Sequence, residues 1–196
     1  MTEPRLAGMS TRTQWLAVAG VLGALAALLV TGIAFTGDIA PVGVGSEAPD
    51  FTATDLASGQ PASLAAHRGE VVLLNIWATW CLPCEQEMPS MQRLYAELAP
   101  SGLRVVAVSI DVGESKTVQD WAAERGLTFA IWHDPSGRIE RLYQTTGVPE
   151  SFVIDRHGVI VKKIIGATEW DHPAQQALIR RLLAGEAAEP TGQDGG

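Results

Sequence analysis

The chain has 196 residues and a formal net charge of -8, with 14 Lys and Arg against 22 Asp and Glu. This length allows one domain of ordinary size and a short extra segment, and 46% of the residues are hydrophobic, too many for a disordered protein. The negative charge and the scattered basic residues argue against a nucleic-acid partner. The two cysteines, Cys81 and Cys84, cannot form a disulfide framework and supply only half of a four-thiolate zinc site, which leaves redox chemistry.

The N-terminal part contains a long apolar segment, residues 15–35, without a charged side chain. As a helix it would be about 31 Å long, close to the hydrocarbon thickness of a bilayer, so we predict a transmembrane anchor. Arg5 and Arg12 precede it, which places residues 1–14 in the cytoplasm and the rest of the chain on the periplasmic side of the cytoplasmic membrane. A cleaved signal peptide is the alternative, although its apolar region usually has about 7 to 15 residues.

After this segment we expect a linker over residues 36–44, a folded domain over residues 45–185 and a disordered tail over residues 186–196. The domain begins with a small hairpin within residues 48–66. Residues 71–77 form an almost continuous apolar run, which is typical of a strand buried on both faces. From residue 84 to 98, apolar residues recur at spacings of three and four and predict an amphipathic helix.

The second half of the domain continues the alternation. We predict a strand over 103–110, a helix over 115–124, a strand over 128–132, a helix over 136–145, strands over 151–155 and 159–165, and a closing helix over 171–183. Strands that alternate with helices favour a mostly parallel sheet, while the last two strands form an antiparallel hairpin. The expected fold class is therefore α/β, with a central mixed sheet flanked by helices.

The cysteines lie between the strand at 71–77 and the helix that follows it. Cys81 is placed at the N-terminal end of this helix, where unpaired N–H groups and the helix dipole stabilise a thiolate. Pro83 falls in the first turn, where its missing N–H costs nothing. Cys84, one turn further on, can attack a mixed disulfide on Cys81 and release the bound partner. This order predicts a redox-active Cys81–Cys84 pair.

Two other uses of a C-x-x-C motif fit less well. Glu85 stands where a haem-attachment motif has His, and a zinc site would need distant histidines. The chain has four, which we expect to be solvated: His67, His133, His157 and His172. We therefore expect no metal and no cofactor apart from the disulfide itself.

Two motifs resemble one known family. Residues 75–89, with the sequence NIWATWCLPCEQEMP, resemble thioredoxin-like proteins of the TlpA/ResA group, relatives of the CcmG (DsbE) proteins of cytochrome c maturation. Residues 146–155, TGVPESFVID, resemble the cis-proline segment of the same group. The resemblance extends over residues 45–183 and implies a thioredoxin-like fold with an N-terminal hairpin extension and an inserted helix. It also implies thiol-disulfide oxidoreductase activity.

The resemblance implies roles for three more residues near the cysteines. The Val148–Pro149 bond would be cis and would pack against the disulfide, so that the Val148 backbone could pair with an extended substrate segment. A trans proline that starts a strand is the alternative. Glu87 would lie near the sulfurs and, with a raised pKa, exchange a proton with Cys84. Its alternative is a solvated acid that favours the helix N-terminus.

Two further residues match the family. Trp80 would shield the disulfide, with simple packing as the alternative. Glu150 would shape the choice of substrate, with a solvated charge at a strand end as the alternative.

The function expected on this basis is a monomeric reductase that keeps cysteines of exported proteins in the dithiol form, including apocytochrome c before haem attachment. A membrane electron carrier of the CcdA or DsbD type would recharge it. Two alternatives stay open at this point. One is net oxidation of exported thiols, which uses the same residues at a higher reduction potential. The other is a copper-binding thioredoxin-like chaperone that uses both cysteines and a distant histidine.

Overall fold

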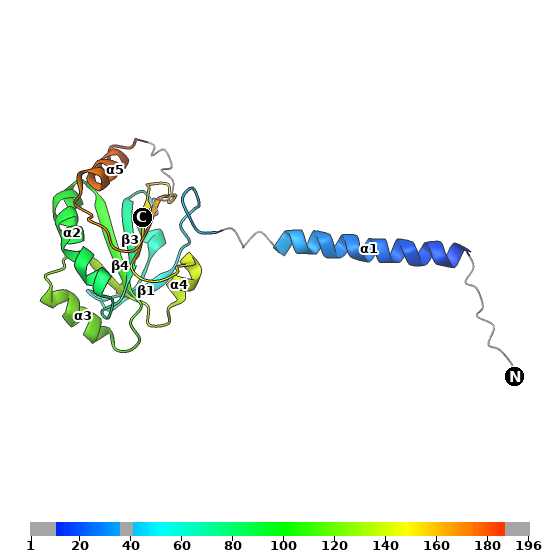
Figure 1. Ribbon diagram of the computed structural model, residues 1–196, viewed down its shortest axis with the longest axis horizontal. Helices are drawn as coiled ribbons and strands as arrows, with labels where there is room; N and C mark the ends of the chain where they lie inside the picture. The colour runs from blue at the N-terminus through cyan, green and yellow to red at the C-terminus, as the bar shows by residue number, and fades with distance from the viewer. Residues whose placement is uncertain (1–10, 36–40, 187–196) are drawn as a thin grey trace. The chain divides into compact units, whose positions relative to one another are not determined.

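The computed structural model describes residues 11–35 and 41–186, and the chain divides into two units, Met1–Pro41 and Val42–Gly196. The first unit contains one described helix, α1 (Thr11–Phe35) (Figure 1). Among the described helices, none combines the length and the apolar character needed to cross a membrane, so the transmembrane anchor expected over residues 15–35 is not shown. The predictions for residues 1–10, 36–40 and 187–196 lie outside the described residues.

Within the described residues, one seven-stranded sheet forms the centre of the second unit, in the order β2-β1-β5-β4-β3-β6-β7. Strands β5, β4 and β3 run parallel, and the other neighbouring pairs are antiparallel, as in the predicted mixed sheet. The strands are β1 (Thr52–Asp55), β2 (Pro61–Ser63), β3 (Val71–Trp77), β4 (Leu103–Ser109), β5 (Ala130–His133), β6 (Glu150–Ile154) and β7 (Ile160–Ile165).

Helices cover both faces of this sheet. Figure 1 shows α2, α3 and α5 on one side and α4 on the other. Their bounds are α2 (Leu82–Leu98), α3 (Ser115–Glu124), α4 (Arg138–Tyr143) and α5 (Pro173–Leu183), and two short 3-10 turns, η2 (Leu64–His67) and η3 (Ala99–Ser101), connect elements. On the α4 side, the rings of Phe51 and Phe152 pack edge to face against Tyr143.

The strands and helices predicted for the folded domain are confirmed, with bounds that differ by a few residues. Strand β3 has the predicted range, and the expected hairpin is the antiparallel pair β1–β2. Helix α2 begins at Leu82, two residues before the apolar stripe, because Cys81 caps it and Pro83 fits its first turn. The pairing of β1 with β5 was not indicated by the sequence, since the two strands are far apart in the chain.

Strand β3 carries the site because it lies at the centre of the sheet and ends just before the cysteines. All seven of its residues are buried, between β4 on one side and β6 on the other. Six of them are apolar, as a strand covered on both faces requires. The seventh is Asn75, an amide in the middle of the core.

Candidate active site

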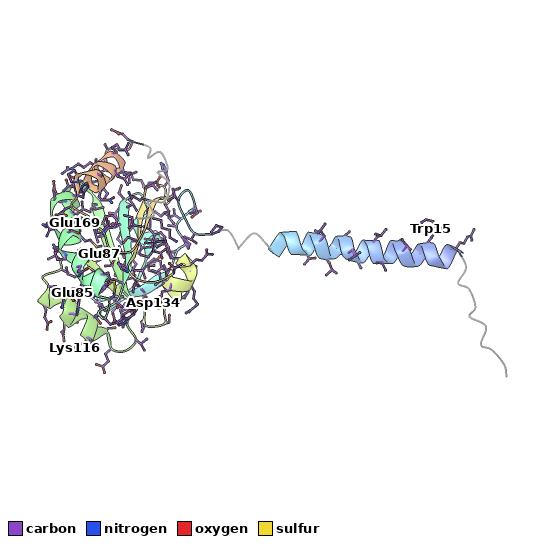
Figure 2. All side chains as sticks on the ribbon, in the orientation of Figure 1. Trp15, Glu85, Glu87, Lys116, Asp134 and Glu169 are labelled. Atoms are coloured by element: carbon purple, nitrogen blue, oxygen red, sulfur yellow. A yellow bond between two sulfur atoms is a disulfide. The ribbon has the colours of Figure 1, made fainter. Side chains whose placement is uncertain are left out.

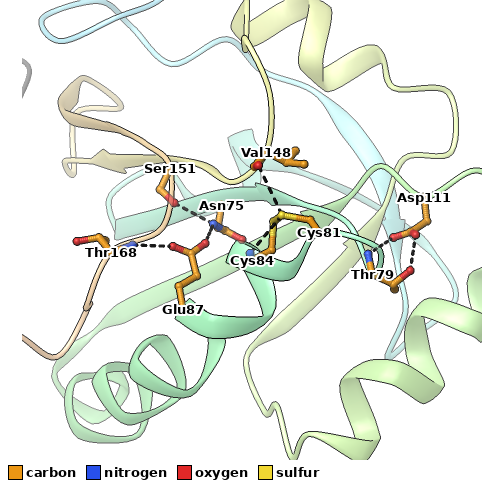
Figure 3. Close-up of a disulfide and its surroundings, with 9 residues drawn as sticks. All are labelled: Asn75, Thr79, Cys81, Cys84, Glu87, Asp111, Val148, Ser151 and Thr168. Carbon is orange, nitrogen blue, oxygen red and sulfur yellow. Dashed lines mark hydrogen bonds between the residues drawn. A yellow bond between two sulfur atoms is a disulfide. The ribbon is translucent and has the colours of Figure 1, made fainter. Parts of the chain in front are cut away.

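The two cysteines form a disulfide where β3 leads into α2. The Sγ atoms of Cys81 and Cys84 are 2.08 Å apart and their Cα atoms 5.2 Å apart (Figure 3). Cys84 is fully buried and Cys81 is 4% exposed. Cys81 is therefore the sulfur that a partner can reach, as the order of the motif predicted.

Cys81 occupies the N-cap position of α2. Its Sγ accepts a hydrogen bond from the backbone N–H of Cys84 at 3.2 Å. The first N–H groups of a helix have no partner within the helix, and they carry the positive end of its dipole. This sulfur thus stands where a thiolate formed by reduction would be stabilised.

A proline loop lies against the disulfide. The Val148–Pro149 peptide bond is cis, as the resemblance implied, and the trans alternative is wrong. The carbonyl oxygen of Val148 is 3.5 Å from Cys81 Sγ (Figure 3). Val148 and Pro149 are therefore placed beside the reactive sulfur, and their role in binding substrate stays a prediction.

Glu87 is buried next to the cysteines. Both Glu85 and Glu87 lie on α2 (Figure 2), but the Glu85 side chain is 43% exposed and paired with Arg125, whereas Glu87 is 2% exposed. The alternative of a solvated acid at position 87 is therefore wrong. The helix stripe that packs on the sheet includes residue 87, so its carboxyl group faces the core.

The environment of Glu87 favours its neutral form. Burial raises the pKa of Glu87 to about 7, against the opposing effects of Asn75, the backbone of Thr168 and the side chain of Trp170. The Nδ2 group of Asn75 donates to Glu87 Oε1 at 2.7 Å, and the N–H of Thr168 donates to Oε2 at 3.3 Å. A carboxyl group with this pKa can accept or give a proton near neutral pH.

The contact with Asn75 was missed at the sequence level. Its amide also donates to Ser151 Oγ at 2.8 Å, because Asn75 and Ser151 lie opposite each other on β3 and β6 (Figure 3). One signal could have pointed to it: Asn75 is the single polar residue in the apolar run at 71–77. A buried amide needs partners, and these come here from β6 and from α2.

Glu150 is fully buried, which corrects the alternative of a solvated charge at a strand end. The Nζ of Lys163, on the adjacent β7, lies 2.7 Å from Glu150 Oε1. Oε2 accepts a hydrogen bond from the N–H of Thr146 at 3.1 Å. Glu150 thus ties the start of the proline loop to the last hairpin, and its effect on substrate choice stays a prediction.

Trp80 lies on the outside of the site. Its side chain is 69% exposed, and Leu82, on the other side of Cys81, is 64% exposed. Both apolar side chains are therefore available to a bound protein. The predicted shielding of the disulfide by Trp80 stays a prediction.

A second carboxylate holds the loop before Cys81. Asp111, just after β4, accepts hydrogen bonds from the N–H and the hydroxyl of Thr79 at 2.9 and 2.5 Å (Figure 3). The hydroxyl of Ser109 also donates to it, at 2.6 Å. Three short hydrogen bonds on one carboxylate fix the turn that presents Cys81.

One histidine departs from the expectation of solvated side chains. His133, at the end of β5, is 2% exposed, and its two ring nitrogens lie 2.8 Å from Ser115 Oγ and from the Asp111 carbonyl oxygen. Burial at a strand end in the core, which the sequence did not reveal, explains the difference. Residues 11–35 and 41–186 contain no cluster of three or more His, Cys, Asp or Glu side chains that could hold a metal ion.

Comparisons with known proteins agree with this geometry. A model described as the AhpC/TSA family matches residues 44–163, a range that contains both the cysteines and the proline loop. The thiol-disulfide oxidoreductase ResA of Geobacillus kaustophilus (strain HTA426) is 44% identical over 128 residues, which cover 65% of this chain and 71% of the relative.

Solved structures show the same similarity. A Chlorobium tepidum protein assigned as thiol:disulfide interchange protein DsbE is 35% identical, with a TM-score of 0.62, over 72% of this chain and 96% of that one. StoA from Bacillus subtilis is 26% identical, with a TM-score of 0.55, over 66% of this chain and 96% of that one. In each case nearly the whole solved structure is matched.

Proposed function

The chain belongs to the AhpC/TSA family and is a thiol-disulfide oxidoreductase of thioredoxin-like fold, and we propose that it reduces disulfides of exported proteins through Cys81 and Cys84. The observation that carries the proposal is the position of Cys81 Sγ. It accepts the Cys84 N–H at the mouth of α2 and lies 3.5 Å from the Val148 carbonyl oxygen. The helix N-terminus can therefore stabilise the Cys81 thiolate, and a backbone group on which a substrate could dock lies next to the same sulfur.

The proposed reaction consumes one dithiol and one disulfide. The Cys81 thiolate attacks a substrate disulfide, which forms a mixed disulfide and releases one substrate sulfur as a thiolate. Cys84 then gives up its proton and attacks Cys81 Sγ, which releases the second substrate sulfur. Two electrons pass from the Cys81–Cys84 pair to the substrate, and the pair ends as the disulfide seen in the structure.

We assign to Glu87 the proton transfer at Cys84. The two residues are three positions apart on α2 and so lie on the same helix face. A pKa of about 7 leaves the Glu87 carboxyl partly ionised near neutral pH, so that it can take the Cys84 proton when the mixed disulfide is resolved.

The partners and the location are further parts of the proposal. Three parts of the proposal rest on the resemblance alone. They are the reductive direction, apocytochrome c as one client, and a CcdA or DsbD-type carrier as the electron donor. Residues 15–35 carry no charged side chain, which supports an anchor that keeps the domain at the outer face of the cytoplasmic membrane. Carbonate extraction of membranes would release residues 42–196 but retain the full chain; release of both would refute the anchor.

Trapping tests whether the substrates are proteins. In cells, a full chain with Cys84→Ser should accumulate mixed disulfides between Cys81 and its clients, because no second thiol resolves them. The matched control is Cys81→Ser, which lacks the attacking sulfur and should trap little. If Cys84→Ser captures no protein beyond the control, proteins are not the substrate.

Equilibration with glutathione tests the direction. A reductase has a low reduction potential, so the Cys81–Cys84 pair should stay mostly oxidised in a glutathione buffer that leaves a strong periplasmic oxidant reduced. A pair that stays mostly reduced in this buffer would show net oxidation of client thiols instead.

A further inference from the structure

One polar atom in the core has no use in the reaction as described so far. Asn75 is fully buried, and its Nδ2 group donates to both Glu87 Oε1 and Ser151 Oγ. Its Oδ1 atom has no hydrogen-bond partner among the described residues. Buried carbonyl oxygens are normally paired, since an unpaired one costs about as much as a lost hydrogen bond.

The view in Figure 3 suggests which group could donate to Asn75 Oδ1. Figure 3 shows its carboxamide between Glu87 and Cys84, with the nitrogen on the Glu87 side and the oxygen on the Cys84 side. In the disulfide, Cys84 Sγ carries no hydrogen and cannot donate. Reduction by a partner dithiol delivers two electrons and two protons, breaks the S–S bond and leaves Cys84 as a buried thiol, whose S–H is a weak donor that Oδ1 can accept.

We propose that Asn75 is a positioning residue that links Cys84 to Glu87. In the dithiol form its Oδ1 accepts the S–H of Cys84, while its Nδ2 holds the Glu87 carboxylate in place. When the mixed disulfide is resolved, the S–H turns from Oδ1 to the Glu87 carboxylate, which takes the proton as Cys84 Sγ attacks Cys81 Sγ. The inference rests on the proposed role of Cys84 as the resolving thiol. Asn75 would be the first residue of β3 with a role in this reaction, whose other residues lie on or next to α2 and in the segment around Pro149.

The other groups that face Glu87 do not carry a charge. They are Asn75 from β3, with Thr168 and Trp170 from the segment before α5. Within the described residues, no charged side chain contributes to the environment of Glu87. A change in its titration after substitution at residue 75 therefore reports the lost amide.

The test compares Asn75→Leu, which keeps the size but removes both polar atoms, with Ser151→Ala, which leaves the amide on Glu87 in place. The reduced full chain is mixed with saturating glutathione disulfide, and the release of glutathione by Cys84 is followed from pH 5 to pH 9. Loss of one hydrogen bond to a carboxylate should move the midpoint from about pH 7 to about pH 8 in Asn75→Leu. Ser151→Ala should keep the midpoint of the parent chain.

A purely structural role would lower the amplitude in Asn75→Leu and leave the midpoint unchanged, which would overturn the proposal. A second measurement tests the hydrogen bond that only the dithiol form makes, between the Cys84 thiol and Oδ1. The equilibrium with reduced and oxidised glutathione should shift about fivefold toward the disulfide in Asn75→Leu, since the dithiol loses one hydrogen bond. An unchanged equilibrium would refute the contact with the Cys84 thiol.

The outcome does not depend on the cellular client. Glutathione is a small probe, so both measurements can succeed even if Cys84→Ser traps no protein in cells. Conversely, trapped clients together with an unchanged midpoint in Asn75→Leu would leave the reductase proposal standing and remove Asn75 from it. Thermal unfolding of each oxidised variant shows whether the substituted chain is folded.

Discussion

Two carboxylates near the disulfide are used in opposite ways. Asp111 accepts three short hydrogen bonds, from the Thr79 N–H, the Thr79 hydroxyl and the Ser109 hydroxyl. Glu87 is more deeply buried and accepts one short bond, from Asn75, and one longer bond, from Thr168. Both lie in the same domain, so the difference comes from the depth of burial and from the geometry of the local donors.

The two carboxylates therefore suit different tasks: Asp111 holds a turn in place, and Glu87 is suited to proton transfer. A carboxylate that accepts several hydrogen bonds from one turn holds that turn in place. Deep burial favours the neutral form of a carboxyl group, as at Glu87. Asp111 thus fixes the turn that precedes Cys81. Glu87, with a pKa of about 7, can gain or lose a proton near neutral pH. The four predictions below test this division.

The largest expected effect is on stability as a function of pH. Burial raises the pKa of folded Glu87 from 4.5 to about 7, so between these values the unfolded chain releases a proton that the folded chain keeps. The free energy of unfolding should therefore fall by about 3 kcal/mol from pH 4.5 to pH 7 through this group alone. The full stabilising contribution is present below pH 4.5 and is lost above pH 7.

Chemical denaturation at several pH values measures this slope. Glu87→Gln has no proton to lose, so the difference between its curve and that of the parent chain isolates residue 87. Parallel curves for the two chains would mean that Glu87 does not titrate in this range.

The next effect is on the rate of disulfide exchange. Glu87→Gln should slow the resolution of the mixed disulfide at pH 8 about a hundredfold, because the acceptor for the Cys84 proton is gone. The first attack by Cys81 should change little. Stopped-flow mixing of the reduced variant with glutathione disulfide separates the two steps, and equal slowing of both would argue against a specific role at Cys84.

A smaller effect is expected on the other side of the disulfide. Asp111→Ala removes the acceptor of three hydrogen bonds and should lower the free energy of unfolding by about 2 kcal/mol. The pH dependence of the Cys84 step should keep its midpoint near pH 7, because Glu87 is untouched. A midpoint that moved in this variant would show that the two carboxylates are coupled.

The smallest effect is expected at Glu85, on the same helix as Glu87. Its carboxylate lies 2.7 Å from Arg125, with side chains 43% and 30% exposed. Glu85→Gln should change the free energy of unfolding by less than about 1 kcal/mol, since solvent screens such pairs. It therefore serves as the control for Glu87→Gln, and a slowing of the Cys84 step comparable to that of Glu87→Gln would undo the contrast between the two acids.

The position of Cys81 could be predicted because it depends on sequence patterns within a few residues of the cysteines. The apolar run at β3, the stripe on α2 and the proline in its first turn together placed Cys81 at a helix N-terminus. The cis bond before Pro149 came only from the resemblance, because most bonds before proline are trans.

The surroundings of Glu87 could not be predicted, because they depend on sheet register. Asn75 and Ser151 are 76 residues apart and meet only because β3 pairs with β6 in one register. Likewise Lys163 reaches Glu150 only because β7 folds back on β6. Spacing along the chain carries no information on such long-range pairs.

The edges of the sheet have a consequence for how an extended client can bind. On one edge, β2 has three residues and begins with Pro61, which lacks an N–H. On the other, the backbone of residues 45–46 already pairs with Ile160, at the start of β7. The β2 edge and the start of β7 are therefore poor places for strand addition, which also limits self-association there. For the proposed client, the predicted docking place is therefore the Val148 backbone beside Cys81 and not an edge of the sheet.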